Sequence, residues 1–261
     1  MGLRINQNIA AQNAYRNLSV TDGQMSKALE KLSSGFRINR AADDAAGLAI
    51  SEGLRSQVGG LKVGVRNAQD GVSVAQTAEG ALTEVHSMLQ RMNDLAVQYA
   101  NGVQNPDSQA ALSAEFTQLQ TEISRIASNT KFNGVTLFND AALDFQVGYD
   151  VGDVITVSAT SLASIDTSTA VITDSNTVQA AITTISAQRA ELGAVQNRFE
   201  HSINSLNVAI ENLSASESRI RDTDMAQEMV AFTRSQILSQ AGTAMLAQAN
   251  QAPQGVLQLL R

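Results

Sequence analysis

Apolar residues recur every seven positions, without a break, along residues 178–213. A second apolar set follows three or four positions after members of the first, which is typical of a helix that buries one narrow seam. At 1.5 Å per residue, a helix of roughly 36 residues is about 54 Å long and needs equally long partners. The two sets are Val178, Ile185, Leu192, Phe199, Leu206 and Leu213, and Ile182, Val195, Ile203 and Ile210.

Two further stretches, about 81–100 and 108–127, carry apolar residues at the same steps and predict those partner helices. The turn signals at 101–102 and 105–106 separate them. Beside the apolar stripe of residues 81–100 lies a row of side chains outside the expected core, which we interpret as a further contact surface: Met88, Arg91 and Leu95. Spacing alone nevertheless favours a solvated helix face for Arg91 and Glu115.

Both ends of the chain predict helices that suit assembly. The first is expected over 4–33, closed by Gly35, and the last from Arg221 onward. Residues 225–260 contain only Glu228 and Arg234 as charges, so this segment is poorly suited to standing alone in water. We expect it to be ordered by partners, with the first helix as its neighbour. The expected apolar stripe of the last helix is Ala226, Val230, Thr233, Ile237, Ala241, Ala244 and Gln248, widened by Met225, Met229 and Phe232; that of the first is Leu18, Met25, Leu29 and Leu32.

The remaining segments predict less regular structure. Six glycines between residues 52 and 80 predict short helices and connections where chains pack closely. After a turn at Asn133-Gly134, two strands are expected at 144–149 and 153–158, and a loop at 159–176. The fold class is therefore mainly α: a long coiled-coil-like helical rod with a small β-hairpin region at about 134–158 and paired terminal helices.

Single residues give no sign of catalytic chemistry. The sequence has no cysteine, and its two histidines, His86 and His201, are isolated. Asp43 and Asp44 suggest metal ligation, but no histidine or further carboxylate lies at ligand spacing. We therefore expect no enzyme activity, cofactor or metal site, although carboxylates far apart in sequence can still meet in a folded chain.

The charge distribution is uneven, because residues 1–66 carry nine Lys or Arg against five Asp or Glu while the whole chain is at −7. A basic N-terminal segment on an otherwise acidic chain can steer self-association. Without interleaved aromatics it does not indicate nucleic-acid binding. No apolar run is long enough to insert into a membrane, and the N-terminus lacks the apolar run of a signal peptide. These rules alone would place the protein in the cytosol.

Six motifs stand in order along the chain: Ser33 to Ile50, Arg66 to Gly71, Ala75 to Leu82, Phe132 to Gly134, Ser218 to Met229 and residues 248–257. Together they resemble the signatures of bacterial flagellins. The resemblance covers nearly everything except roughly 139–175, and these outer residues are too few for large variable domains.

The resemblance implies a self-assembling subunit of the extracellular flagellar filament. Residues 1–44 and 219–261 would form the inner-tube domain, and 45–218 the helical rod domain. Export would use the flagellar type III route without a cleaved signal peptide, against the cytosolic expectation. The implied partners are other copies of the chain, an export chaperone, and hook-associated and cap proteins. A hook–filament junction protein and a coiled-coil binding adaptor remain as alternatives.

One further implication concerns host recognition. Residues 90–98 resemble the flagellin segment that the flagellin-sensing Toll-like receptor recognises. The match places the motif's arginine on Arg91, its leucine on Leu95 and the partner glutamate on Glu115. In the family this surface also serves contacts between subunits along a protofilament.

Overall fold

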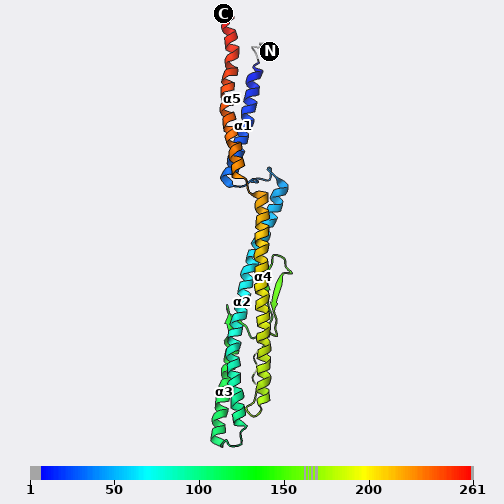
Figure 1. Ribbon diagram of the computed structural model, residues 1–261, viewed down its shortest axis with the longest axis vertical. Coiled ribbons are helices and arrows are strands. Elements are labelled where there is room, and N and C mark those ends of the chain that lie inside the picture. Colours follow the sequence, from blue (N-terminus) through cyan, green and yellow to red (C-terminus); the bar gives the residue numbers. More distant parts are fainter. Residues whose placement is uncertain (1–6, 162, 164, 166, 168–169, 260–261) are drawn as a thin grey trace. The chain divides into compact units, whose positions relative to one another are not determined.

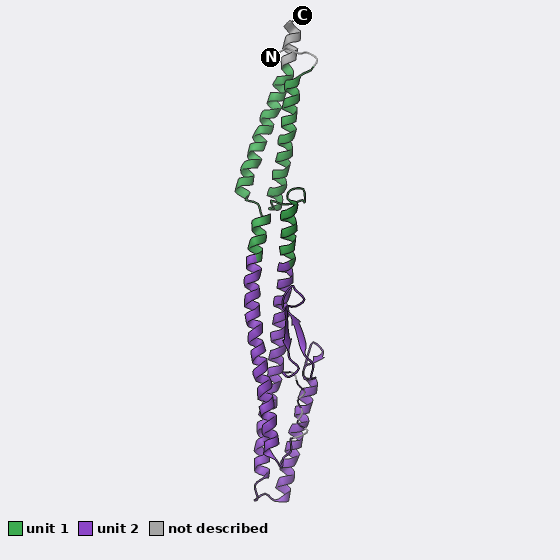
Figure 2. Ribbon diagram, turned by 90° about the vertical axis from the view of Figure 1, so that its right-hand side faces the viewer, with its two compact units in different colours: residues 1–56, 213–261 green, residues 57–212 purple. Residues whose placement is uncertain are grey.

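The computed structural model describes residues 7–161, 163, 165, 167 and 170–259. These residues form five helices and two short antiparallel strand pairs (Figure 1), which confirms the mainly α class with a small β region. The helices are α1 (Ile9–Ser34), α2 (Ala45–Tyr99), α3 (Pro106–Asn129), α4 (Ser175–Arg221) and α5 (Met225–Leu259). Figure 2 colours two compact units. We call residues 1–56 with 213–261 the terminal unit, and residues 57–212 the central unit.

The core of the central unit is built on the seven-residue repeat of α4. Val178, Ile185, Leu192 and Phe199 are buried among apolar residues of α2 and α3. The helix is longer than the 178–213 that the repeat predicts: it runs from Ser175 to Arg221, and Arg219 and Arg221 in its last turn suit the negative end of the helix dipole. The second partner helix, α3, begins at Pro106, with Asn105 as its cap: the Asn105 side chain accepts a hydrogen bond from the Ser108 N–H.

Helix α2 runs unbroken through the glycine-rich stretch, so the expectation of short helices over 52–80 is wrong. Close packing, the other half of that expectation, is confirmed at Gly60, Gly64 and Gly71, whereas a Cβ at Gly53, Gly59 or Gly80 would meet no atom within 4 Å. A Cβ added to Gly64 would lie 2.4 Å from the Val147 carbonyl oxygen, and one on Gly71 would lie 2.4 Å from Phe199 Cζ. Gly60, Gly64 and Gly71 therefore make room for neighbouring chain at an intrinsic cost of about 0.5–1 kcal/mol each in helix stability.

The strands form two hairpins in the central unit. β1 (Lys131–Phe132) pairs with β2 (Val135–Thr136) around the predicted turn at Asn133-Gly134, whose φ angles of 48° and 83° are both positive. β3 (Leu143–Gln146) pairs with β4 (Val154–Val157), somewhat shorter than expected. The Phe145 ring on β3 meets the Phe199 ring edge-on, with centroids 5.5 Å apart, which fastens this hairpin to α4. Part of the predicted loop at 159–176 (residues 162, 164, 166, 168 and 169) lies outside the described residues.

Helix α1 of the terminal unit begins and ends at capping residues. The Asn8 side chain accepts a hydrogen bond from the Ala11 N–H, which starts the helix at Ile9, so residues 7 and 8 of the predicted helix precede it. Residues 4–6 of the predicted helix lie outside the described residues. Gly35, at φ 75°, ends α1 as the sequence predicts.

The last helix begins later than predicted. Arg221 is the end of α4, and α5 starts at Met225. Asp224 sets this boundary, because its Oδ1 accepts hydrogen bonds from the N–H groups of Ala226 and Gln227 and so caps α5. The acidic residue belongs at this position because the N-terminus of a helix favours negative charge.

A joint within the terminal unit ties the end of α1 to the connection between α4 and α5. The Arg37 N–H donates to the Arg221 carbonyl (2.6 Å), and the Thr223 N–H donates to the Gly35 carbonyl (3.0 Å). The Arg221 guanidinium lies 4.7 Å from the centroid of the Phe36 ring and 2.8 Å from Glu52 Oε1. A single side chain thus connects three segments through a cation–π contact and an ion pair.

Candidate assembly surface

Helices α1 and α5 pack antiparallel, as contacts along their length show. The Asn8 side chain donates to the Ala249 carbonyl (2.7 Å), and Ser239 Oγ donates to Asp22 Oδ1 (3.0 Å). At the other end, Lys31 lies 3.8 Å from the Glu228 carboxylate. The expected pairing of the terminal helices is therefore confirmed.

The seam on α5 differs from the one the sequence predicts. The residues that face α1 follow a strict four–three alternation of mostly small or polar side chains: Glu228, Phe232, Ser235, Ser239, Gly242, Leu246 and Ala249. Val230 and Ile237, expected on the buried stripe, are instead 61% and 60% exposed. The physical reason is that small residues let the two helices approach closely, as where Gly242 meets Leu18. Large apolar side chains are left on the outside.

The assembly residues expected on α1 divide between the two faces of this helix. Leu18, Met25 and Leu32 are half-buried on the side that meets α5. Leu29 is 57% exposed, and it is joined outside the seam by Tyr15 and Val20. Each terminal helix therefore has one face that meets its partner helix and another that presents apolar side chains to solvent.

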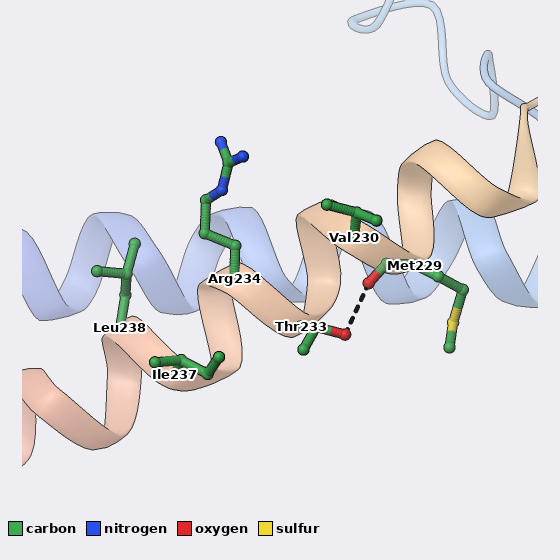
Figure 3. Close-up of a pocket in the computed structure, with 6 residues that line it drawn as sticks. All are labelled: Met229, Val230, Thr233, Arg234, Ile237 and Leu238. Atoms are coloured by element: carbon green, nitrogen blue, oxygen red, sulfur yellow. Dashed lines mark hydrogen bonds between the residues drawn. The ribbon is translucent and has the colours of Figure 1, made fainter.

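The exposed face of α5 forms an open apolar groove of about 520 Å³ (Figure 3). Thr233 Oγ1 donates to the Met229 carbonyl in the same helix, so this hydroxyl is already satisfied. Arg234 carries the one charge in the lining. The lining residues are Met229, Val230, Thr233, Arg234, Ile237 and Leu238. Met225, also predicted as an assembly residue, is exposed one turn before the groove.

The groove has no chemistry beyond apolar contact and one cation. Within the described residues, no group of three or more His, Asp or Glu side chains is placed to hold a metal ion. None of the described helix segments combines the length and the hydropathy that a membrane crossing requires. What this surface is able to do is bury apolar area against another surface.

The second candidate surface lies in the central unit, where Arg91 of α2 meets Glu115 of α3. Arg91 Nε donates to Glu115 Oε1 at 2.8 Å, and the two side chains remain 53% and 42% exposed. The hydrogen bond to Glu115 raises the pKa of Arg91 above its usual value. The structure therefore joins two residues that spacing alone placed on a solvated face.

Leu95 does not belong to this exposed surface, and its expected off-core position is wrong. Its side chain is fully buried, while Met88 is half-buried against the same core. Because residues of both α3 and α4 contribute to this core, the buried face of α2 is wider than the narrow seam assumed from the sequence. Leu95 supports the helix beneath Arg91 and is not itself available to a partner.

Comparison with known proteins matches nearly the whole chain to one family. The family model for the bacterial flagellin N-terminal helical region matches residues 5–142, and that for the bacterial flagellin C-terminal helical region matches residues 175–260. Only a short segment separates the two, as the sequence predicts for a form without large variable domains.

Full-length relatives agree with the family models. The chain is 54% identical to a flagellin of Halalkalibacterium halodurans, with 98% of this chain and 99% of the relative covered. It is 46% identical to a flagellin of Bacillus subtilis (99% and 100% covered) and 44% identical to the flagellar filament 33 kDa core protein of Treponema phagedenis (98% and 99%). The chain therefore belongs to the bacterial flagellin family, whose members are structural subunits of the extracellular flagellar filament.

Proposed function

We propose that this flagellin polymerises through the exposed apolar faces of α1 and α5, so that the terminal helices, residues 1–44 and 219–261, form the inner tube of the filament. The observation that carries the proposal is the inverted arrangement of the pair. On α5 the side that faces α1 carries mostly small and polar residues, whereas large aliphatic side chains such as Val230 and Ile237 face solvent. In a helix pair with this pattern, burial of the outer faces against another surface removes more large apolar side chains of α5 from water than the contact with α1 does.

The outer face of α5 supplies enough apolar area to drive association. Full burial of a Val, Leu, Ile or Met side chain is worth about 1.5–3 kcal/mol. The groove holds Met229, Val230, Ile237 and Leu238, each of them at least half exposed. Covering them therefore contributes several kcal/mol per subunit, before the entropy of immobilising the subunit is subtracted.

The test is polymerisation of purified protein, measured by sedimentation and electron microscopy, for the wild type and Val230→Asp. A carboxylate buried in the apolar interface costs about 2 kcal/mol or more. This cost raises the concentration needed for polymerisation by about thirtyfold or more. Val151→Asp is the matched control, because it makes the same change at a valine of the central unit that is 93% exposed. Normal filaments from Val230→Asp would refute the assigned role of α5.

A trimmed chain of residues 45–218 tests whether the terminal helices, and not the helical rod, are needed for polymerisation. We expect filaments from the full chain and none from the trimmed chain, because the trimmed chain lacks both apolar faces. Circular dichroism of the trimmed chain should still show its helices. Filaments from residues 45–218 would overturn the proposal that the terminal helices build the polymer.

The same exposed face is the proposed binding surface for partner proteins before and during assembly. A subunit that waits for the flagellar type III export route presents the α5 groove to the cytosol, where a chaperone that covers it would prevent premature association. At the ends of the filament, hook-associated and cap proteins would meet the same terminal helices. A chaperone that protects Met229 and Ile237 from solvent-accessible labelling would support this assignment, and unchanged labelling would contradict it.

Recognition by the flagellin-sensing Toll-like receptor is proposed for the surface around Arg91 and Glu115. Support comes from the resemblance of residues 90–98 to the recognised segment and from the exposed ion pair that joins the two residues. Leu95 contributes indirectly, because its burial fixes the helix that carries Arg91.

A further inference from the structure

Asparagine precedes glycine at two places in this sequence, and the structure treats the two differently. Asn101-Gly102 lies in the connection between α2 and α3, and Asn133-Gly134 forms the turn between β1 and β2. Both asparagines are exposed to water. Because glycine has no side chain, the approach of its main-chain nitrogen to the preceding asparagine is unobstructed. We infer that Asn101, and not Asn133, is a site of spontaneous conversion to aspartate and isoaspartate in the folded protein.

The conversion needs only water. The Gly102 main-chain nitrogen attacks Asn101 Cγ, so that an N–Cγ bond forms and the Cγ–Nδ2 bond breaks. The Gly102 amide proton leaves with the side-chain NH2 as ammonia, and a five-membered succinimide remains. Water then adds to either carbonyl of the ring and opens it. One opening gives aspartate, and the other gives isoaspartate, in which the main chain passes through the side-chain carbonyl.

The geometry at Asn101 favours ring closure. Asn101 Oδ1 accepts a hydrogen bond from the Val103 N–H at 3.3 Å. The loop of atoms closed by this hydrogen bond contains both Asn101 Cγ and the Gly102 nitrogen, so it holds the two reacting atoms on the same side of the turn. The Val103 N–H also stabilises the negative charge that develops on Oδ1 during attack, in the manner of an oxyanion hole.

The geometry at Asn133 opposes the same step. Asn133 and Gly134 form a two-residue hairpin loop in which both φ angles are positive. The pairing of Phe132 with Val135 closes the loop, and the Leu137 N–H donates to the Thr130 carbonyl just beyond it. Attack by the Gly134 nitrogen requires rotation about the Asn133 Cα–C bond. This rotation displaces the second strand, so the hairpin must open first.

The connection between α2 and α3 also contains an internal control. Asn105 is followed by Pro106, whose nitrogen carries no proton and is already fully substituted. Asn105 Oδ1 is engaged in capping α3 through the Ser108 N–H. Asn105 therefore reports on direct side-chain hydrolysis at the same end of the helical hairpin, without the ring-closing route.

The products change the connection in two ways. Either product replaces a neutral amide with a carboxylate, so the chain becomes one charge more negative at neutral pH. Isoaspartate also inserts one methylene group into the main chain between α2 and α3. Both changes occur ten residues after Arg91, within the helical hairpin that carries the Arg91–Glu115 pair.

The experiment incubates the folded full-length protein in mildly alkaline buffer and quantifies each asparagine-containing peptide by mass spectrometry. Labelling by an isoaspartyl methyltransferase identifies the isoaspartate product. Asn101 should react about tenfold or more faster than Asn133, because the hydrogen bonds of the hairpin must open before Asn133 reacts. Asn105 should stay unchanged. In denaturant the rates of Asn101 and Asn133 should converge, since both then precede glycine in a free chain.

Gly102→Ala is the matched variant. A Cβ at this position meets no atom within 4 Å, so the fold tolerates it. The added methyl group should slow conversion of Asn101 while leaving the rate of Asn133 unchanged. Equal rates at Asn101 and Asn133 in the folded protein would overturn the inference, as would a Gly102→Ala rate equal to that of the wild type.

Discussion

Gly71→Ala is expected to destabilise the central unit, although alanine is the better helix former. The new Cβ would lie 2.4 Å from Phe199 Cζ and 2.7 and 2.8 Å from the two Cε atoms of the ring. The ring cannot easily withdraw, because Phe199 is fully buried and packs edge-on against Phe145. Only a shift of the helices or of the Phe145 hairpin relieves the contact.

The two opposing energies are similar in size, and their difference sets the expected result. Alanine gains about 0.8–1 kcal/mol of helix propensity over glycine. Overpacking of a close-packed core costs about 1–3 kcal/mol, and contacts this short lie at the upper end of that range. We therefore expect a net loss of about 1–2 kcal/mol. For a unit of this size, that loss lowers the melting temperature by about 2–8 °C.

Gly80→Ala provides the control on the same helix. A Cβ at Gly80 meets no atom within 4 Å, so alanine should stabilise the protein by about 0.5–1 kcal/mol. The assay is thermal and denaturant unfolding followed by circular dichroism on both variants. If Gly71→Ala melts as high as Gly80→Ala, the close packing of Phe199 on α2 is refuted. A Phe199→Leu background should remove most of the penalty at Gly71, which a double-mutant cycle measures.

Three further predictions concern charged groups. Arg91→Ala combined with Glu115→Ala should weaken receptor activation in a reporter-cell dose response, because the exposed ion pair is lost. The pKa of Asp43 lies below its usual value because the backbone N–H groups of Arg40 and Asn39 donate to its carboxylate. The ionised carboxylate should therefore stabilise the folded protein fully at pH values above the usual pKa, and this stabilisation should be lost as the pH falls through the lowered pKa. Arg221→Ala should destabilise the terminal unit by roughly 1–3 kcal/mol in denaturant unfolding, because the contacts with Phe36 and Glu52 disappear.

Each of these predictions has a contradicting outcome. An unchanged dose response, with Arg125→Ala as the control for an exposed arginine of the same unit, would show that the receptor motif does not act in this chain. An Asp43 carboxyl that titrates in NMR at or above its ordinary value would contradict the two backbone hydrogen bonds. Equal stability of Arg221→Ala and the wild type would contradict the role of this side chain at the joint, and Arg221→Lys separates the planar guanidinium from the charge alone.

The sequence predicts most of those parts of the fold in which large aliphatic residues face a core within the same chain; Leu95, which is buried although its spacing predicts a position off the core, is an exception. The seven-residue repeat of α4 is read correctly because Val178, Ile185, Leu192 and Phe199 bury in the subunit itself. The helix end at Gly35 and the turn at Asn133-Gly134 are predicted correctly for a related reason. Their signals are local and depend on the backbone conformation of single residues.

The errors arise where the partner of a residue is distant or belongs to another molecule. Gly64 and Gly71 look like helix breakers because the groups they accommodate, Val147 and Phe199, lie about 80 and 130 positions away. Val230 looks like a core residue because its burial is expected only in the polymer. The Arg91–Glu115 contact joins two helices and has no periodic signal, so only the family resemblance pointed to it.

The side of α5 that faces α1 carries mostly small and polar side chains, so packing between the two helices contributes less to their order than two large apolar faces would. If the outer faces polymerise as proposed, contacts with neighbouring copies stabilise the pair further, by mass action. Hydrogen exchange in these helices should accordingly be fast in dilute subunits and slow within a filament. On this proposal, the filament end serves as the template on which each arriving pair becomes rigid. Growth by addition to existing ends is therefore favoured over the start of new filaments in solution.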